Sequence, residues 1–131
     1  MARDERGSAV VASLVALATL TFGAVIWMAR DVSTTIARRA DASDIAFQAA
    51  RAGAQGLDIA ALRGSDPVVR LDPLEARRRA NEAAMTMFAV ADLDGRIVSV
   101  DVGEDRVEVV VEVVAPTALI EGRATVLAQR N

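Results

Sequence analysis

Residues 8–29 read SAVVASLVALATLTFGAVIWMA, a run of 22 residues without a charged side chain. A helix of this length is roughly 33 Å long, which is enough to cross a ~30 Å hydrocarbon layer. Arg6 and the pair Arg30-Asp31 place charges at both edges of the run. Trp27 lies near the distal edge, where an amphipathic ring suits the lipid–water interface. The run therefore predicts a transmembrane helix.

A cleaved secretory signal peptide is the rival interpretation of this run. The apolar core of such a peptide usually has ~7–15 residues, fewer than are present here. Residues 27–29 are Trp-Met-Ala, so a bulky side chain stands where a small one normally precedes the cleavage site. Both features favour a segment that stays in the membrane. The basic residues on its two sides do not decide its orientation.

Small residues recur within the run at Ser8, Ala12, Ala16, Thr19 and Gly23. Their spacing of three or four residues places them on one face of a helix. Such a face lets a second transmembrane helix approach closely. Ala and Ser are also common in membrane helices that have no such partner, and the sequence leaves both interpretations open.

The helix is expected to continue beyond the membrane, because residues 30–52 contain neither Pro nor Gly. We expect one helix from about Gly7 to Ala54, which Gly53 and Gly56 bring to an end. Its distal half has a weakly apolar stripe that is predicted to face a domain or a partner. The stripe consists of Val32, Ile36, Ala40, Ser43, Phe47, Ala50 and Ala54.

A second, shorter helix is predicted to begin at Asp72-Pro73. Asp72 suits the N-cap, Pro73 suits the first turn, and Glu75 stands at the capping-box position. This helix should run to about Phe88. The preceding residues 57–71 contain Gly64 and Pro67 and are expected to form a loop.

Alternating apolar residues after this helix predict a three-stranded antiparallel sheet. The strands are expected at residues 96–102, 106–114 and 123–129, with a turn at 103–105 and a loop between Pro116 and Gly122. Val98, Val100 and Val102 should share one face, as should Val107, Val109, Val111 and Val113, while Glu108 and Glu112 point outward. The apolar face needs a cover, which the distal half of the long helix can supply. The predicted fold class is therefore α+β.

Composition excludes several kinds of chemistry. The chain has no Cys, His, Tyr or Lys, so disulfides, thiolates, zinc sites of the usual kind and the commonest general bases are absent. Asp92-Leu93-Asp94-Gly95 resembles the start of a calcium loop, but the residues that follow break that pattern and favour a turn. We predict no catalytic residue, no metal site, no cofactor and no enzymatic activity.

Charge points away from nucleic acid as a partner. Residues 57–131 carry nine Arg and thirteen acidic residues, and aromatic residues make up only 3% of the chain. Arg77, Arg78 and Arg79 are consecutive, so on a helix they point in three directions and favour a solvated surface over an anion site.

The layout as a whole resembles the TadE/TadG-like proteins of tight-adherence (Flp, type IVc) pilus and related secretion systems. The resemblance rests on Arg6-Gly7-Ser8 before the apolar run, on IARRADASDIAFQAARAGAQ at 36–55, on the helix opening at Leu71-Asp72-Pro73, and on the Val-rich hairpin. It implies a pilin-like fold in which residues 1–7 are a leader and 8–29 the membrane helix. Residues 30–56 then extend that helix, and 57–131 form a small extracytoplasmic domain.

The resemblance also implies a function. Such proteins are single-pass components of the cytoplasmic membrane, and many are cut by a prepilin peptidase after a Gly, which makes Gly7/Ser8 the candidate bond. The family usually has Glu as the fifth residue after the cut, whereas this chain has Ala12. The expected partners are the lipid bilayer, other pilin-like or secretion-system membrane proteins, and the prepilin peptidase. The alternatives are an unprocessed membrane-tethered binding module and a secreted domain released by signal peptidase.

Overall fold

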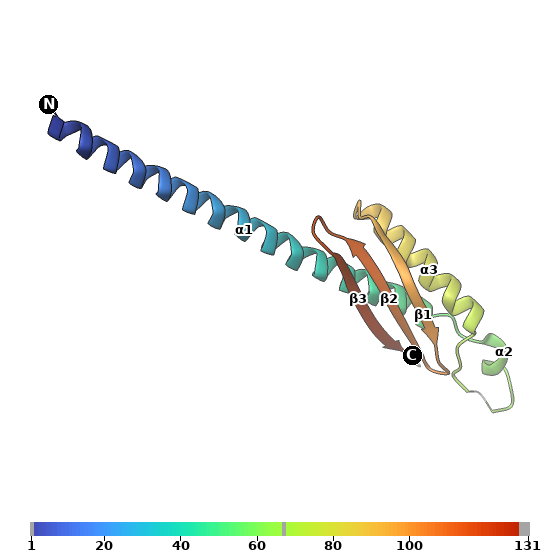
Figure 1. Ribbon diagram of the computed structural model, residues 1–131. Coiled ribbons are helices and arrows are strands. Elements are labelled where there is room, and N and C mark those ends of the chain that lie inside the picture. Colours follow the sequence, from blue (N-terminus) through green and yellow to red (C-terminus); the bar gives the residue numbers. More distant parts are fainter. Residues whose placement is uncertain (1, 67, 129–131) are drawn as a thin grey trace. The chain divides into compact units, whose positions relative to one another are not determined.

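The computed structural model describes residues 2–66 and 68–128, with the side chains of residues 2–6 left out. Three helices precede three strands (Figure 1). They are α1 (Ala2–Ala54), α2 (Ile59–Leu62), α3 (Pro73–Val90), β1 (Gly95–Val102), β2 (Arg106–Val114) and β3 (Leu119–Leu127). The chain divides into two compact units, unit 1 up to Thr35 and unit 2 from Ile36 onward. The predicted α+β class is confirmed, including the long first helix, the shorter helix and the antiparallel sheet.

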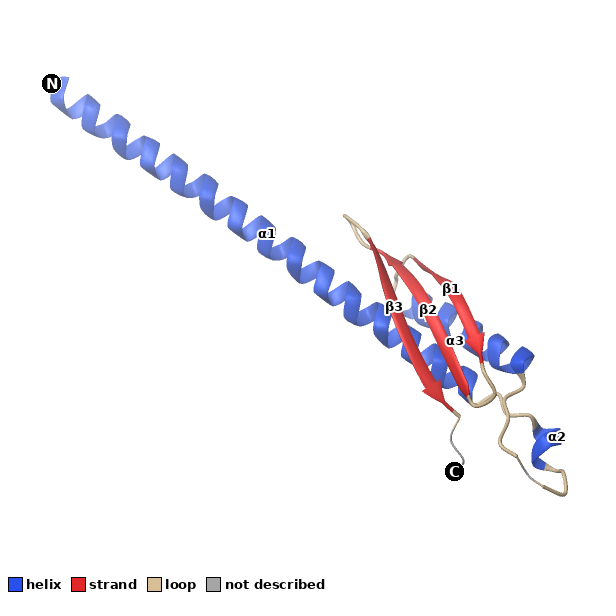
Figure 2. Ribbon diagram, turned by 60° about the horizontal axis from the view of Figure 1, so that its bottom comes forward, coloured by secondary structure: helices blue, strands red, loops and turns tan. Residues whose placement is uncertain are grey.

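Unit 2 has two layers, with both long helices on the same face of the sheet (Figure 2). The strand order is β1-β2-β3, and both pairings are antiparallel. The predicted inward face of β2 is confirmed, because four of its valines are fully buried. These are Val107, Val109, Val111 and Val113. They form the centre of a core in which every buried residue is apolar.

Small residues let both helices approach this sheet closely. The buried face of α3 repeats every four residues as Ala76, Ala80, Ala84 and Phe88. On α1, the buried residues of unit 2 are Ala42, Ile45, Ala46, Ala49, Ala50, Gly53 and Ala54. Alanine gives up contact area, but it brings the helix backbone near the strands and loses no side-chain entropy on burial.

The apolar stripe predicted to cover the sheet was placed on the wrong side of α1. Ile36, Ala40, Ser43 and Phe47 are exposed, and of that stripe only Ala50 and Ala54 are buried. The face of α1 that packs on the sheet consists of alanines, Gly53 and Ile45, because larger side chains next to Gly122 would hold α1 away from β3. The bulkier apolar residues are left facing outward.

A β-bulge in β1 changes the predicted inward face of this strand. The pairing with β2 shifts between Ile97 and Ser99, so Val98 has no directly opposite partner and lies exposed. Ile97, Val100 and Val102 pack against the core instead. The expected set of Val98, Val100 and Val102 was therefore wrong at its first member, because a bulge breaks the two-residue alternation.

The third strand begins earlier than predicted. Residues 119–122 belong to β3, whereas the sequence was interpreted as a loop up to Gly122. Gly122 pairs with Val111, and a β-carbon at Gly122 would overlap the backbone of Ala42 in α1. Glycine is therefore needed at this position for close helix packing, not for a turn. The strand ends at Leu127, and the predicted terminal residue Gln129 lies outside the described residues.

The expected loop at 57–71 contains the one-turn helix α2. Asp58 caps it by accepting hydrogen bonds from the backbone N–H groups of Ala60 and Ala61, at 3.0 and 3.2 Å. An isolated β-bridge between Leu57 and Leu71 closes the segment at its base. The Asp58 cap is a local signal of the same kind as the one at Asp72.

The start of α3 confirms the N-cap and the Pro but not the capping box. The Asp72 carboxylate accepts from the N–H groups of Leu74 and Glu75 at 3.0 and 3.3 Å. The backbone N–H of Asp72 donates to the carbonyl of Gly56 instead of to Glu75. Glu75 is therefore free to pair with arginines of the next turn.

Candidate functional site

The apolar part of α1 is exposed over its whole described length. Within the described residues, one helix is long and apolar enough to cross a membrane, and none of its apolar window is buried inside the protein. The exposed side chains include Leu14, Leu17, Leu20, Phe22 and Trp27. Because no described residue of unit 1 covers this surface, it has the character of a helix that could face lipid.

The hydroxyl groups of Ser13, Thr19 and Thr21 find their hydrogen-bond partners within this helix. Ser13 donates to the carbonyl of Ala9 at 2.9 Å, and Thr19 donates to that of Val15 at 2.8 Å. Thr21 repeats the pattern. Polar groups satisfied within the helix can enter hydrocarbon at low cost, because no hydrogen-bonding group is left without a partner.

The predicted packing face lies on one uninterrupted helix. Ser8, Ala12, Ala16, Thr19 and Gly23 are all exposed members of α1, and their helical spacing aligns them. A β-carbon at Gly23 would meet no atom within 4 Å, so no contact within the chain requires Gly at that position. The same is true of Gly7, which with Ser8 forms the candidate processing bond. Whether a partner helix uses this face stays a prediction.

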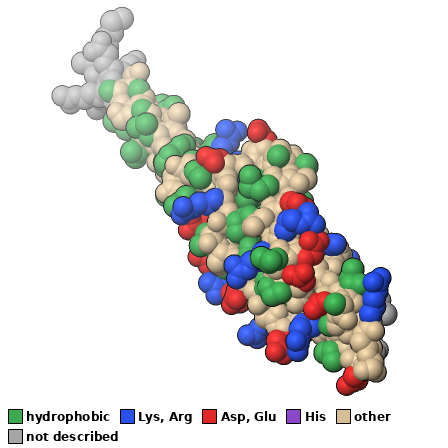
Figure 3. Space-filling view, turned by 90° about the vertical axis from the view of Figure 1, so that its right-hand side faces the viewer, with side chains coloured by type: hydrophobic (Ala, Val, Ile, Leu, Met, Phe, Trp, Pro, Cys, Tyr) green, Lys and Arg blue, Asp and Glu red, His purple; other side chains and the backbone are tan. Residues whose placement is uncertain are grey.

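Charged side chains are interspersed over unit 2 (Figure 3). On the outer face of the sheet, Arg96 pairs with Glu112 at 2.7 Å, and Arg123 pairs with Glu108 and Glu121 at 3.4 Å each. The pairs Arg96–Glu112 and Arg123–Glu108 join neighbouring strands, whereas Glu121 lies on the same strand as Arg123. Val110 lies on the same face and is buried among them. The face is a solvated sheet surface with both signs of charge present.

A second charged group follows the start of α3. Glu75 accepts hydrogen bonds from Arg78 and Arg79, and Arg78 also pairs with Glu82 at 2.8 Å. The hydrogen bond from Arg78, followed by that from Arg79, lowers the pKa of Glu75 from its ordinary 4.5 to about 2. The same pairing raises the pKa of Arg78. The three consecutive arginines are exposed, as predicted for a solvated surface.

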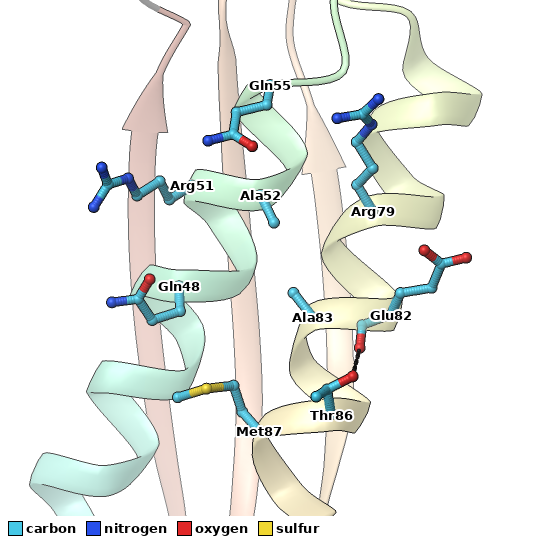
Figure 4. A pocket seen from close by; sticks show the side chains of 9 residues that line it. All are labelled: Gln48, Arg51, Ala52, Gln55, Arg79, Glu82, Ala83, Thr86 and Met87. Atoms are coloured by element: carbon cyan, nitrogen blue, oxygen red, sulfur yellow. Dashed lines mark hydrogen bonds between the residues drawn. The ribbon is translucent and has the colours of Figure 1, made fainter. Parts of the chain in front are cut away.

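A shallow groove of about 570 Å³ runs between α1 and α3 (Figure 4). Ala52 and Ala83 form its floor between longer polar side chains. The other lining residues are Gln48, Arg51, Gln55, Arg79, Glu82, Thr86 and Met87. Sequence reasoning missed this groove, and its only signal is an alanine on each helix between longer residues. At the edge of the groove, Arg79 is paired with Glu75 at 2.7 Å.

The turn at Asp92–Gly95 connects α3 to β1, as the sequence predicted. Asp92 adopts a positive φ of 50°, and the N–H of Leu93 donates to the carbonyl of Phe88 at 3.0 Å. Asp tolerates this left-handed conformation better than most residues. In the described part of the chain, no three acidic residues lie close enough together to hold a metal ion.

Comparison of the chain with protein-family models, with curated proteins and with solved structures finds no match.

Proposed function

We propose that this chain is a membrane-anchored, pilin-like component of a tight-adherence type pilus or a related secretion apparatus, in the manner of a minor pilin or pseudopilin. Residues 8–29 would anchor it in the cytoplasmic membrane as a single span. Unit 2 would lie on the extracytoplasmic side. The helix face from Ser8 to Gly23 would pack against other pilin-like or secretion-system membrane proteins.

One observation carries this proposal. Helix α1 is exposed and apolar along residues 8–29, yet one face of its residues 42–54 belongs to the hydrophobic core of unit 2. A membrane anchor and an independent binding domain need not share one helix, since a flexible linker is enough to connect them. A helix that is both anchor and core element supports a subunit whose domain is displayed from a helical stem.

The first test is the intact mass of the protein from membranes of a bacterium that has a prepilin peptidase. A chain that begins at Ser8 supports the proposal. A chain that keeps residues 1–7 favours the unprocessed membrane-tethered module. A chain that has lost everything before about Arg30 contradicts both and leaves a secreted domain.

The second test concerns the packing face itself. Ala16→Leu places a bulky side chain on this face, and it should reduce the recovery of membrane proteins that co-purify in mild detergent. Ala18→Leu is the matched control, because it makes the same change on another side of the helix. Equal recovery with both variants would contradict a role for this face.

A further inference from the structure

The two hairpin turns of the sheet differ in composition. The turn between β1 and β2 contains Glu104 and Asp105, with Arg106 next to them. The turn between β2 and β3 lies within residues 113–120, which read VVAPTALI and carry no charge. Hairpin turns on a solvated surface are usually polar, so the uncharged turn calls for a different environment.

Contacts in unit 2 place the two turns at opposite ends of the domain. A β-carbon at Gly53, near the end of α1, would lie 3.0 Å from the Val107 side chain at the start of β2. Further along β2, Val111 pairs with Gly122, which lies against Ala42 of α1. The charged turn is therefore at the end where α1 stops. The uncharged turn is at the end where α1 enters unit 2 (Figures 1 and 2).

Apolar side chains are exposed around the uncharged turn. Val114 is 47% exposed and Leu119 is 62% exposed, although the two are cross-strand partners. The end of α3 adds Val90, which is 80% exposed. The N–H of Val114 donates to the carbonyl of Asp94 at 2.8 Å, so the α3–β1 connection lies beside this turn. No residue in the described part of unit 2 covers these side chains.

The chain itself limits how far this end can lie from the membrane. The chain makes seven residue-to-residue steps from Ala29, the last of the apolar run, to Ile36, the first of unit 2. Even fully extended they span no more than about 25 Å, and less as a helix. This step rests on the part of the proposed function in which residues 8–29 cross a membrane.

We propose that the uncharged β2–β3 turn contacts the lipid–water interface of the membrane in which the chain is anchored. Val114 and Leu119 would meet the boundary between headgroups and acyl chains, as apolar residues of interfacial segments do. Glu112 and Glu121 flank the turn, and each is paired with an arginine. No basic residue lies within residues 113–120, so the surface fits zwitterionic headgroups and not an anionic patch.

The test uses the full chain, which has no cysteine of its own. Thr117→Cys places a label in the uncharged turn, and Glu104→Cys places the same label in the charged turn as the matched control. Each protein is labelled with an environment-sensitive fluorophore and reconstituted into phosphatidylcholine vesicles, with or without headgroup-nitroxide lipid. Ala118→Cys serves as a second site in the turn if the first variant does not fold.

The label at 117 should be quenched at least about two-fold by the nitroxide lipid and should shift to shorter wavelength, because interfacial residues lie at headgroup depth. The label at 104 should stay unchanged. Equal signals from both positions in protein that floats with the vesicles would overturn this inference alone. Protein that does not float with vesicles would overturn the membrane anchor itself.

Discussion

Replacement of Gly122 by Ala tests the packing of α1 against β3. The added β-carbon would overlap the carbonyl group of Ala42 and would lie 2.8 Å from the backbone nitrogen of Ser43. The latter distance alone is about 0.6 Å short of ordinary van der Waals contact, which begins near 3.4 Å. Both obstacles are backbone atoms of a helix, so rotation of a side chain cannot relieve the overlap.

The cost follows from the movement that the substitution forces. A separation of 0.5–1 Å between packed surfaces forfeits roughly a quarter to a half of their dispersion attraction. Overpacking of a core costs about 1–3 kcal/mol, and the upper end applies here because the helix must move as a body. For a domain of unit 2's size, a loss of about 3 kcal/mol lowers the Tm by roughly 12–24 °C.

The assay is thermal unfolding of the full chain in detergent micelles, followed by far-UV circular dichroism. Trp27 is the only Trp and lies outside unit 2, and there is no Tyr, so intrinsic fluorescence would not report this unfolding. Gly64→Ala is the control, since its β-carbon would meet only the Ala61 carbonyl at 3.7 Å. If Gly122→Ala and Gly64→Ala melt at the same temperature, α1 does not pack on β3 as described.

Three further predictions use the same assay. Phe88→Ala should cost about 3–5 kcal/mol, because this largest side chain of the buried α3 face would leave a cavity. Asp72→Ala should cost about 1 kcal/mol through loss of the two N-cap hydrogen bonds, whereas exposed Asp66→Ala should change little. Glu75 has a lowered pKa in the folded state, so its stabilising effect is complete above pH 4.5 and is lost as the pH falls to about 2. The Tm difference between the parent and Glu75→Gln should therefore shrink over that range, and a constant difference would contradict the pairing with Arg78.

Local signals predicted the elements whose causes are local. The N-cap at Asp72 and the following Pro marked the start of α3, because capping involves only residues two and three positions away. Valine at every second position from Val107 to Val113 predicted β2 with its correct bounds and its correct inward face. This strand is central and pairs on both sides, so its sequence of apolar residues follows the burial of its side chains more closely than in the edge strands.

The errors arose where a distant segment decides the structure. Gly122 was interpreted as the end of a loop, whereas its role is to admit the backbone of Ala42, which lies 80 positions earlier in the chain. The bulge at Val98 depends on its register with β2, which alternation within β1 cannot reveal. The buried face of α1 was misplaced because hydrophobicity was weighed and side-chain size was not.

The candidate packing face could be named from the sequence, but its use could not be tested by one chain. In the core of unit 2, glycine is needed for close packing within the chain, since a β-carbon at Gly56 would lie 2.8 Å from the nitrogen of Ala76. In unit 1 the same residue class has open space around it, as at Gly23. Glycine with open space around it, on a helix long and apolar enough to cross a membrane, supports the proposed contact with another transmembrane helix.

Because Gly23 has open space around it and Gly56 does not, a substitution at Gly23 can change association without changing the folding of unit 2. Gly23→Leu should leave the Tm of unit 2 unchanged within about 0.5 kcal/mol, because the side chain enters open space outside that unit. It should nevertheless reduce co-purification in the same way as Ala16→Leu. A Gly23→Leu variant that lowers the Tm of unit 2 would show that the two parts of α1 do not act separately. One that leaves both quantities unchanged would remove Gly23 from the packing face.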